Sequence, residues 1–122
     1  MALLRGRVAT GAGDLNRWMQ LYSDEYEAAT GLRLYPGCLN ILLDEPWSLP
    51  DETLQLSAER AGRLVHLVPC SFMGRDCFIF RTDNAERAGF DEHLVLEVLA
   101  DVSLRSAHGL RDGDLVEVMV SC

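Results

Sequence analysis

With 122 residues, of which 48% are hydrophobic, the chain is long enough for one packed domain, residues 1–122, and too short for two full cores. The formal net charge is −8 and every basic residue is an arginine, which argues against a nucleic-acid partner because neutralising phosphates requires a basic face. No apolar run approaches the ~18 residues of a membrane span, and the N-terminus does not resemble a signal peptide, so we expect a cytoplasmic protein without membrane contact.

The first part of the chain is predicted to hold a strand, a loop with glycines and a helix. Residues 3–9 are a strand in which Gly6 indicates a bulge or the close approach of another backbone. The loop at residues 10–16 is either an ordinary turn or a cradle that presents backbone N–H groups to an anion. From residue 17 to residue 29, apolar and aromatic residues recur at helical spacing, which predicts one helix that ends at Gly31.

A turn at residues 34–37 leads into residues 38–43, an extended segment that is apolar on both faces except at Asn40. A buried carboxamide without a partner costs about 1–3 kcal/mol, so Asn40 must be hydrogen-bonded or bound to something. Either Asn40 pairs with a neighbouring loop, or it points into a site together with Cys38, two residues before it on the same face.

The middle of the chain is predicted to be a loop followed by two strands. Residues 44–57 are polar and contain two prolines, and we expect Trp47 to anchor this loop. Strands are predicted at residues 64–69 and 77–81, with a charged loop at 82–89. His66 is expected to be a satisfied strand residue. Cys70 and Cys77 are expected to be buried thiols, and zinc bound by both with a histidine is the alternative.

The last part is predicted to hold two strands separated by a helical turn. Residues 94–100 are strongly apolar except for Glu97, and an acid in such a strand lies either at a sheet edge or in a functional site. A helical turn is predicted at residues 103–109, and a turn at 112–114 leads into a strand at 115–120. About six short strands and one helix predict a mainly β protein, a small closed or nearly closed barrel with the helix packed outside.

An ordered set of motifs covers nearly the whole chain, although no single motif is decisive. The set consists of Gly6-Arg7-Val8, Gly11-Ala12-Gly13-Asp14, residues 34–40, Cys77-Phe78-Ile79-Phe80-Arg81-Thr82, residues 96–102, Ser103-Leu104-Arg105 and residues 109–118. In this order and at this spacing the motifs resemble the archaeal-type CTP-dependent riboflavin kinases, a family of six-stranded cradle-loop barrels with bacterial relatives.

The resemblance implies phosphoryl transfer from CTP to the 5′-hydroxyl of riboflavin, giving FMN and CDP, with Mg²⁺ as cofactor and small molecules as the only partners. It places Mg²⁺ on Cys38 and Asn40 in the barrel's cavity, and the flavin on Thr82 and Glu97. Asn40 and Glu97 would be the catalytic residues, with Glu97 orienting the flavin or taking the hydroxyl proton. The nucleotide would contact two segments: Gly11, Ala12, Gly13, Asp14, Leu15 and Asn16, and Ser103, Leu104, Arg105 and Ser106.

The chain departs from the family pattern at the metal site and in the nucleotide loop. Cys38 stands where the family has threonine, and a thiol is a poor substitute for a hydroxyl as a ligand of Mg²⁺. Leu15 and Asn16 stand where the family has glycine and arginine. A non-catalytic flavin- or nucleotide-binding barrel that has lost its metal site is therefore the alternative. A DNA- or partner-binding module, known among related small barrels, is disfavoured by the acidic charge.

Overall fold

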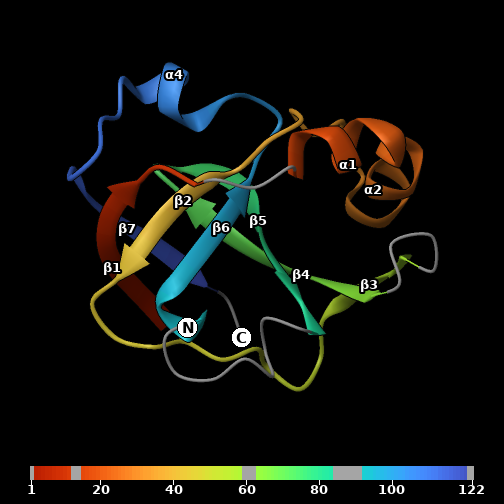
Figure 1. Ribbon diagram of the computed structural model, residues 1–122, viewed down its shortest axis with the longest axis horizontal. Coiled ribbons are helices and arrows are strands. Elements are labelled where there is room, and N and C mark those ends of the chain that lie inside the picture. The colour runs from red at the N-terminus through yellow and green to blue at the C-terminus, as the bar shows by residue number, and fades with distance from the viewer. Residues whose placement is uncertain (1, 12–14, 59–62, 84–91, 121–122) are drawn as a thin grey trace.

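Six strands close into an antiparallel barrel (Figure 1). The computed structural model describes residues 2–11, 15–58, 63–83 and 92–120. The order around the ring is β4, β5, β6, β2, β1 and β7, and a pairing of β7 with β4 closes it, which confirms the predicted mainly β barrel. The strands are β1 Ala2–Ala9, β2 Leu39–Leu43, β4 Arg63–Phe72, β5 Arg75–Thr82, β6 Val95–Leu99 and β7 Leu115–Val120.

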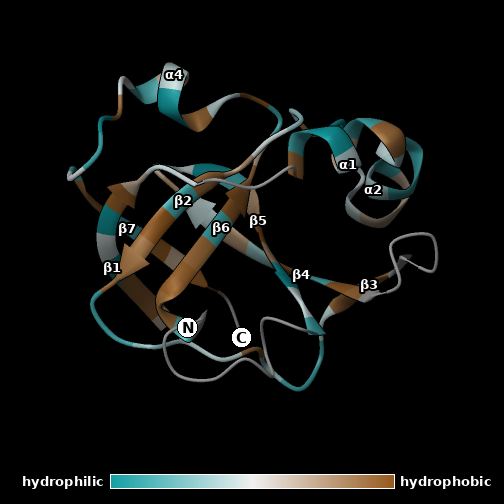
Figure 2. Ribbon diagram, in the orientation of Figure 1, coloured by the Kyte–Doolittle hydropathy of each residue, from teal (hydrophilic) through white to brown (hydrophobic). Residues whose placement is uncertain are grey.

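The interior of the barrel is filled with apolar side chains. Because side chains alternate across a strand, every second residue points inward. Ile41, Ile79, Leu96 and Val118 are inward residues with at most 1% of their surface exposed, and all belong to one packed cluster. Figure 2 shows the barrel strands as largely hydrophobic, whereas the segment that follows β2 is largely hydrophilic. The residues between the inward ones face outward.

Two short helices, α1 Leu15–Leu21 and α2 Ser23–Thr30, cover part of the outer surface. Met19 of α1 and Tyr26 of α2 are buried in a second cluster, outside the barrel, with Leu67, Phe78 and Leu99. The prediction of one continuous helix over residues 17–29 is wrong, because the chain forms two helices that are separated at Tyr22. The residues that follow, Ser23, Asp24 and Glu25, suit the first turn of a new helix, where acidic side chains meet the positive end of the helix dipole.

The segment between β2 and β4 is only partly a loop. The structure has a strand, β3 Leu54–Ala58, that pairs with β4 outside the ring, so the prediction of a loop up to residue 57 is wrong at its end. β3 forms because Leu56 is buried in the outer cluster, a tertiary contact that a five-residue strand does not reveal in its sequence. Trp47 does anchor the segment: its carbonyl accepts a hydrogen bond from the Arg81 guanidinium, which also lies 5.0 Å from the ring centre.

The predicted helical turn is helix α4 Leu104–His108, which lies at one end of the barrel (Figure 1). Ser103 caps its start, and Leu104 packs into the barrel's interior cluster. A short 3-10 helix, η2 Glu92–Leu94, precedes β6. The loop predicted at residues 82–89 falls mostly outside the described residues. No helix in the described ranges is long and apolar enough to cross a membrane.

Candidate functional site

Asn40 and Glu97 lie directly opposite each other on the neighbouring strands β2 and β6. Residues in direct register share a face of the sheet. That face is the outer one, because the neighbours Leu39, Ile41, Leu96 and Val98 fill the interior. The prediction that Asn40 points into the barrel's cavity is therefore wrong. β6 is paired on both sides, with β2 and β5, so Glu97 is not an edge residue, and the functional reading of this acid remains.

Cys38 joins this pair, as its position two residues before Asn40 predicts. Its thiol donates a hydrogen bond to Glu97 Oε2 over a sulfur–oxygen distance of 3.8 Å and also interacts with the Asn40 side chain. Burial, followed by the charge of Glu97, raises the pKa of the Cys38 thiol to about 12. At neutral pH the sulfur is therefore a protonated donor, and it is a softer atom than the oxygen ligands that Mg²⁺ prefers.

Gly11 packs directly on the Asn40 carboxamide. A β-carbon on residue 11 would lie 2.3 Å from Asn40 Nδ2 and 2.8 Å from its Oδ1, which is closer than such atoms approach in proteins. Any side chain at residue 11 would have to displace the Asn40 carboxamide, so the glycine loop begins against the proposed metal-binding residue. Ala12, Gly13 and Asp14 of the same predicted segment lie outside the described residues. Leu15 and Asn16 open helix α1, where Asn16 Oδ1 accepts a hydrogen bond from the Arg17 N–H.

The second predicted nucleotide segment reaches the same end of β1. Arg105 Nη2 donates to the carbonyl of Ala9 at 3.2 Å and to Asp112 Oδ1 at 2.8 Å. Ala9 is opposite Asn40 in the β1–β2 register. Arg105 is therefore hydrogen-bonded to β1, the strand next to the Asn40–Glu97 pair. The hydroxyl of Ser103 donates a hydrogen bond to the hydroxyl of Ser106 at 3.2 Å. The side chain of Leu104 is buried in the core.

Asp112 connects the two nucleotide segments, a role that its place in a predicted turn does not reveal. One carboxylate oxygen accepts from Arg105, and the other accepts from Thr10 Oγ1 at 2.6 Å. The hydrogen bonds from Thr10 and Arg105 lower the pKa of Asp112 below its ordinary value. Thr10 immediately precedes Gly11, so a single carboxylate sets the distance between the glycine loop and Arg105.

A small cavity of about 30 Å³ lies between Cys38 and the Ser103–Arg105 segment. Tyr35, about half of whose surface is exposed, lines the cavity and is held there by a hydrogen bond from its N–H to the Ala100 carbonyl at 2.8 Å. The cavity shows that the segments assigned to the metal and to the nucleotide border one space, although they are far apart in the sequence.

Thr82 is buried at the end of β5, opposite Val65. It lies two residues after Phe80, which is opposite Glu97, so Thr82 is on the outer face that also carries Glu97. The structure thus puts both predicted flavin residues on one side of the sheet, on adjacent strands.

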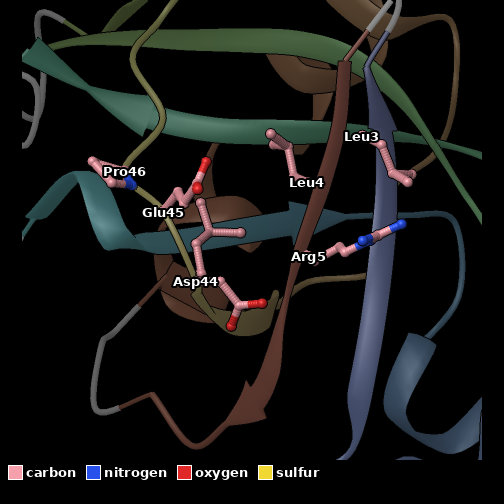
Figure 3. Close-up of a pocket in the computed structure, with 7 residues that line it drawn as sticks. Leu3, Leu4, Arg5, Asp44, Glu45 and Pro46 are labelled. Atoms are coloured by element: carbon pink, nitrogen blue, oxygen red, sulfur yellow. The ribbon is translucent and has the colours of Figure 1, made fainter.

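A larger cavity of about 400 Å³ lies at the far end of β2, and no predicted site residue lines it. Figure 3 shows Leu4 and Glu45 facing its space, with Asp44 and Pro46 beside them. Arg5, which also lines this cavity, forms an ion pair with Glu117, with 2.7 Å between Arg5 Nε and Glu117 Oε2.

The histidine and cysteine predictions are resolved in favour of structural roles. His66 Nδ1 is 2.8 Å from Thr53 Oγ1, and its Nε2 is 2.5 Å from Asp83 Oδ1, so the ring is satisfied on both sides. Cys70 and Cys77 are buried, free thiols directly opposite each other on β4 and β5. No group of three or more histidine, cysteine or acidic side chains that could hold a metal ion occurs among the described residues.

Comparison with known proteins assigns the family. The family model CTP-dep_RFKase, described as "Domain of unknown function DUF120", matches residues 8–120. The chain belongs to the CTP-dependent riboflavin kinase family. This confirms the resemblance inferred from the ordered motifs.

Curated relatives carry the name riboflavin kinase. The chain is 32% identical to the protein of Methanocella arvoryzae, over 95% of this chain and 56% of the relative. It is 32% identical to the protein of Methanospirillum hungatei JF-1, over 98% of this chain and 58% of the relative. For Staphylothermus marinus the identity is 26%, over 96% of this chain and 90% of the relative. The chain therefore spans little more than half the length of two of these relatives and most of the third.

Proposed function

We propose that this chain phosphorylates riboflavin with a nucleoside triphosphate, CTP by the name of its family, giving FMN and CDP. The observation that carries the proposal is the in-register pair Asn40 and Glu97 with Gly11 packed on the carboxamide. Residues that the resemblance assigns to the metal, the flavin and the nucleotide are neighbours here, which supports the proposal. The names of the relatives support riboflavin as the acceptor, and the family name supports CTP as the donor.

In this proposal the donor's phosphates lie between the glycine loop and the Ser103–Ser106 segment. Phosphoryl transfer depends on positioning and charge neutralisation more than on covalent help from the protein. The chain contains no lysine, so the guanidinium of Arg105 and backbone N–H groups are what it offers to the phosphates. Arg105 is held by Asp112 and by the carbonyl of Ala9, two residues before Gly11, which supports this role.

A divalent cation, Mg²⁺, would neutralise phosphate charge when bound. The residues fit it in part, because Asn40 and Glu97 offer hard oxygen atoms in register, and Mg²⁺ is commonly held by one or two such groups together with substrate phosphates. Cys38 does not fit, since sulfur is a soft ligand for Mg²⁺ and the thiol donates to Glu97. We therefore assign the cation to Asn40 and give Cys38 the role of holding Glu97.

Glu97 is the carboxylate that we assign to the acceptor's hydroxyl, which it orients or from which it takes the proton. The thiol of Cys38 fixes one oxygen of this carboxylate. Thr82, on the same outer face of the adjacent strand, offers a hydroxyl to the flavin.

A non-catalytic flavin- or nucleotide-binding barrel is the second candidate, and the protonated Cys38 thiol at the metal position favours it. The two candidates are separated by incubating the purified chain with riboflavin, each of the four common nucleoside triphosphates, and Mg²⁺ or Mn²⁺. We expect FMN with CTP and Mg²⁺, and its loss in Asn40→Ala. Absence of FMN under every condition would overturn the kinase proposal. Binding of riboflavin or CDP without turnover, also in Cys38→Thr, would support the second candidate.

A further inference from the structure

An exposed apolar row crosses the outer face of the barrel beside the Asn40–Glu97 pair. Leu42 of β2 is opposite Val95 of β6 and, on its other side, opposite Arg7 of β1. Leu42 is 51% exposed and Val95 is 38% exposed. Exposed apolar side chains that form a contiguous patch next to polar groups commonly mark a binding surface, whereas single ones need no explanation.

The row lies on the same face as the pair, one step along the strands. Leu42 follows Asn40 by two residues, and Val95 precedes Glu97 by two, so all four side chains point outward. At a rise of about 3.3 Å per residue, the two rows are about 7 Å apart. Helices α1 and α2 bury the outer face elsewhere, at Phe78 and Leu99. The exposed row is therefore a part of the sheet face that the helices leave uncovered beside the site.

Arg7 borders the row on the β1 side. Its Nη1 donates to the Gly113 carbonyl at 3.3 Å, and the residue beyond it in register is Leu115 on β7. A guanidinium can stack on the face or meet the edge of a planar aromatic ring. The surface thus combines a flat apolar floor with one planar cation at its side.

We propose that Leu42 and Val95 form the floor on which the fused ring system of the acceptor lies while its terminal hydroxyl reaches Asn40 and Glu97. This inference rests on the proposed function and specifies how that site holds its acceptor. The five-carbon chain between the rings and the terminal hydroxyl of riboflavin, at about 1.5 Å per bond, spans roughly 7 Å when extended. That length matches the separation of the two rows. Contact between the apolar faces of the rings and the side chains of Leu42 and Val95 removes apolar surface from water, which favours binding.

A protein partner fits this surface less well. A stable protein interface buries at least about 1,000 Å², and its core is depleted of charged residues. Here the charged Arg7 interrupts the apolar row, because it separates Leu42 and Val95 from the exposed Leu115. The acceptor's ring, which needs only a small flat floor, is the occupant that the observations favour.

The test uses charge substitutions on the floor and a matched control on the same outer face. Leu42→Asp and Val95→Asp are compared with Leu3→Asp, because Leu3 is 44% exposed and points outward from β1 but lies four residues away from Arg7. Riboflavin binding is measured by quenching of flavin fluorescence, CDP binding by calorimetry, and the KM for riboflavin by FMN formation. Thermal unfolding of each variant confirms that it is folded.

We expect each floor variant to weaken riboflavin binding by about tenfold or more. CDP affinity should stay within about twofold of the original protein, as should every parameter of Leu3→Asp. Leu42→Phe, which keeps an apolar floor, should retain riboflavin binding. Titration of riboflavin should also shift the methyl resonances of Leu42 and Val95 in the unmodified protein, a measurement that needs no variant.

The outcomes distinguish this inference from the function on which it rests. If the unmodified protein neither binds nor phosphorylates riboflavin, the proposed function fails, and the inference fails with it. If the unmodified protein makes FMN but the floor variants bind riboflavin normally and the methyl resonances do not move, only the inference is overturned. The same holds if the floor variants instead abolish a concentration-dependent dimer, because the surface is then an interface between copies of this chain.

Discussion

Gly11 and Asn40 touch so closely that a single added carbon at residue 11 would lie 2.3 Å from the Asn40 amide nitrogen. We predict that Gly11→Ala lowers turnover by about tenfold or more, because the new methyl must displace the carboxamide assigned to the cation. The Asn40 side chain has room to rotate at a small cost, so the melting temperature should change little. FMN formation and thermal unfolding, measured on the same preparation, check both parts.

Gly6 provides the contrast to Gly11. A β-carbon there would lie 2.3 Å from the backbone carbonyl oxygen of Leu42, which cannot move without disturbing the β1–β2 pairing. Gly6→Ala should therefore destabilise the fold by about 1–3 kcal/mol, as overpacking does. Denaturant unfolding measures this loss. An unchanged midpoint in Gly6→Ala, or a large loss of stability in Gly11→Ala, would contradict this assignment of the two glycines.

Replacement of Cys38 by threonine should improve the metal site. A hydroxyl is a harder ligand than a protonated thiol, so the Mg²⁺ concentration that gives half-maximal FMN formation should fall several-fold. Cys38→Val is the matched control, because valine has the shape of threonine without the hydroxyl. Equal behaviour of the threonine and valine variants would show that size, and not ligand chemistry, matters at this position.

The reactivity of Cys38 should report the charge of Glu97. Burial is the main cause of the raised pKa of the thiol and the negative charge of Glu97 is the next, so Glu97→Gln should lower the pKa while burial keeps it above its ordinary value. Alkylation of Cys38 by iodoacetamide, followed by mass spectrometry across a pH series, should therefore begin at lower pH in Glu97→Gln. Asp44→Asn, at the far end of β2, should leave the profile unchanged.

Asp112 should matter for nucleotide binding and for stability in acid. Its pKa is lowered by Thr10 and Arg105, so the stabilisation is present above its ordinary pKa and is lost as pH falls through the lowered value. Asp112→Asn should thus lower the melting temperature slightly near neutral pH, and the difference from the unmodified protein should vanish in strong acid.

In the same variant, CDP affinity should fall several-fold because Arg105 loses its anchor. Asp51→Asn, an exposed acid in the segment between β2 and β3, should change neither property. Unaltered CDP binding in Asp112→Asn would mean that Arg105 is positioned without this carboxylate.

Local patterns predicted most elements of the barrel. The strands around Gly6, Asn40, Glu97 and the last hydrophobic run appear where apolar runs bounded by turn residues put them, because a strand packed in a barrel must bury apolar side chains. Strand β3 was missed because it depends on burial of Leu56 in the cluster outside the barrel, and the break at Tyr22 was missed although residues that suit a helix start follow it. The expectations of a single domain and of a cytoplasmic location stay predictions.

From its sequence alone, this protein could be recognised as a small acidic barrel whose ordered motifs match one kinase family, and Cys38, Asn40 and Glu97 could be singled out as unusual in apolar strands. Only the tertiary structure decided that these three meet on the outside of the barrel, that Gly11 touches Asn40 and that Asp112 connects Thr10 to Arg105. The reason is that strand register and ring closure pair residues far apart in the chain, and no local pattern encodes which residue will stand opposite which.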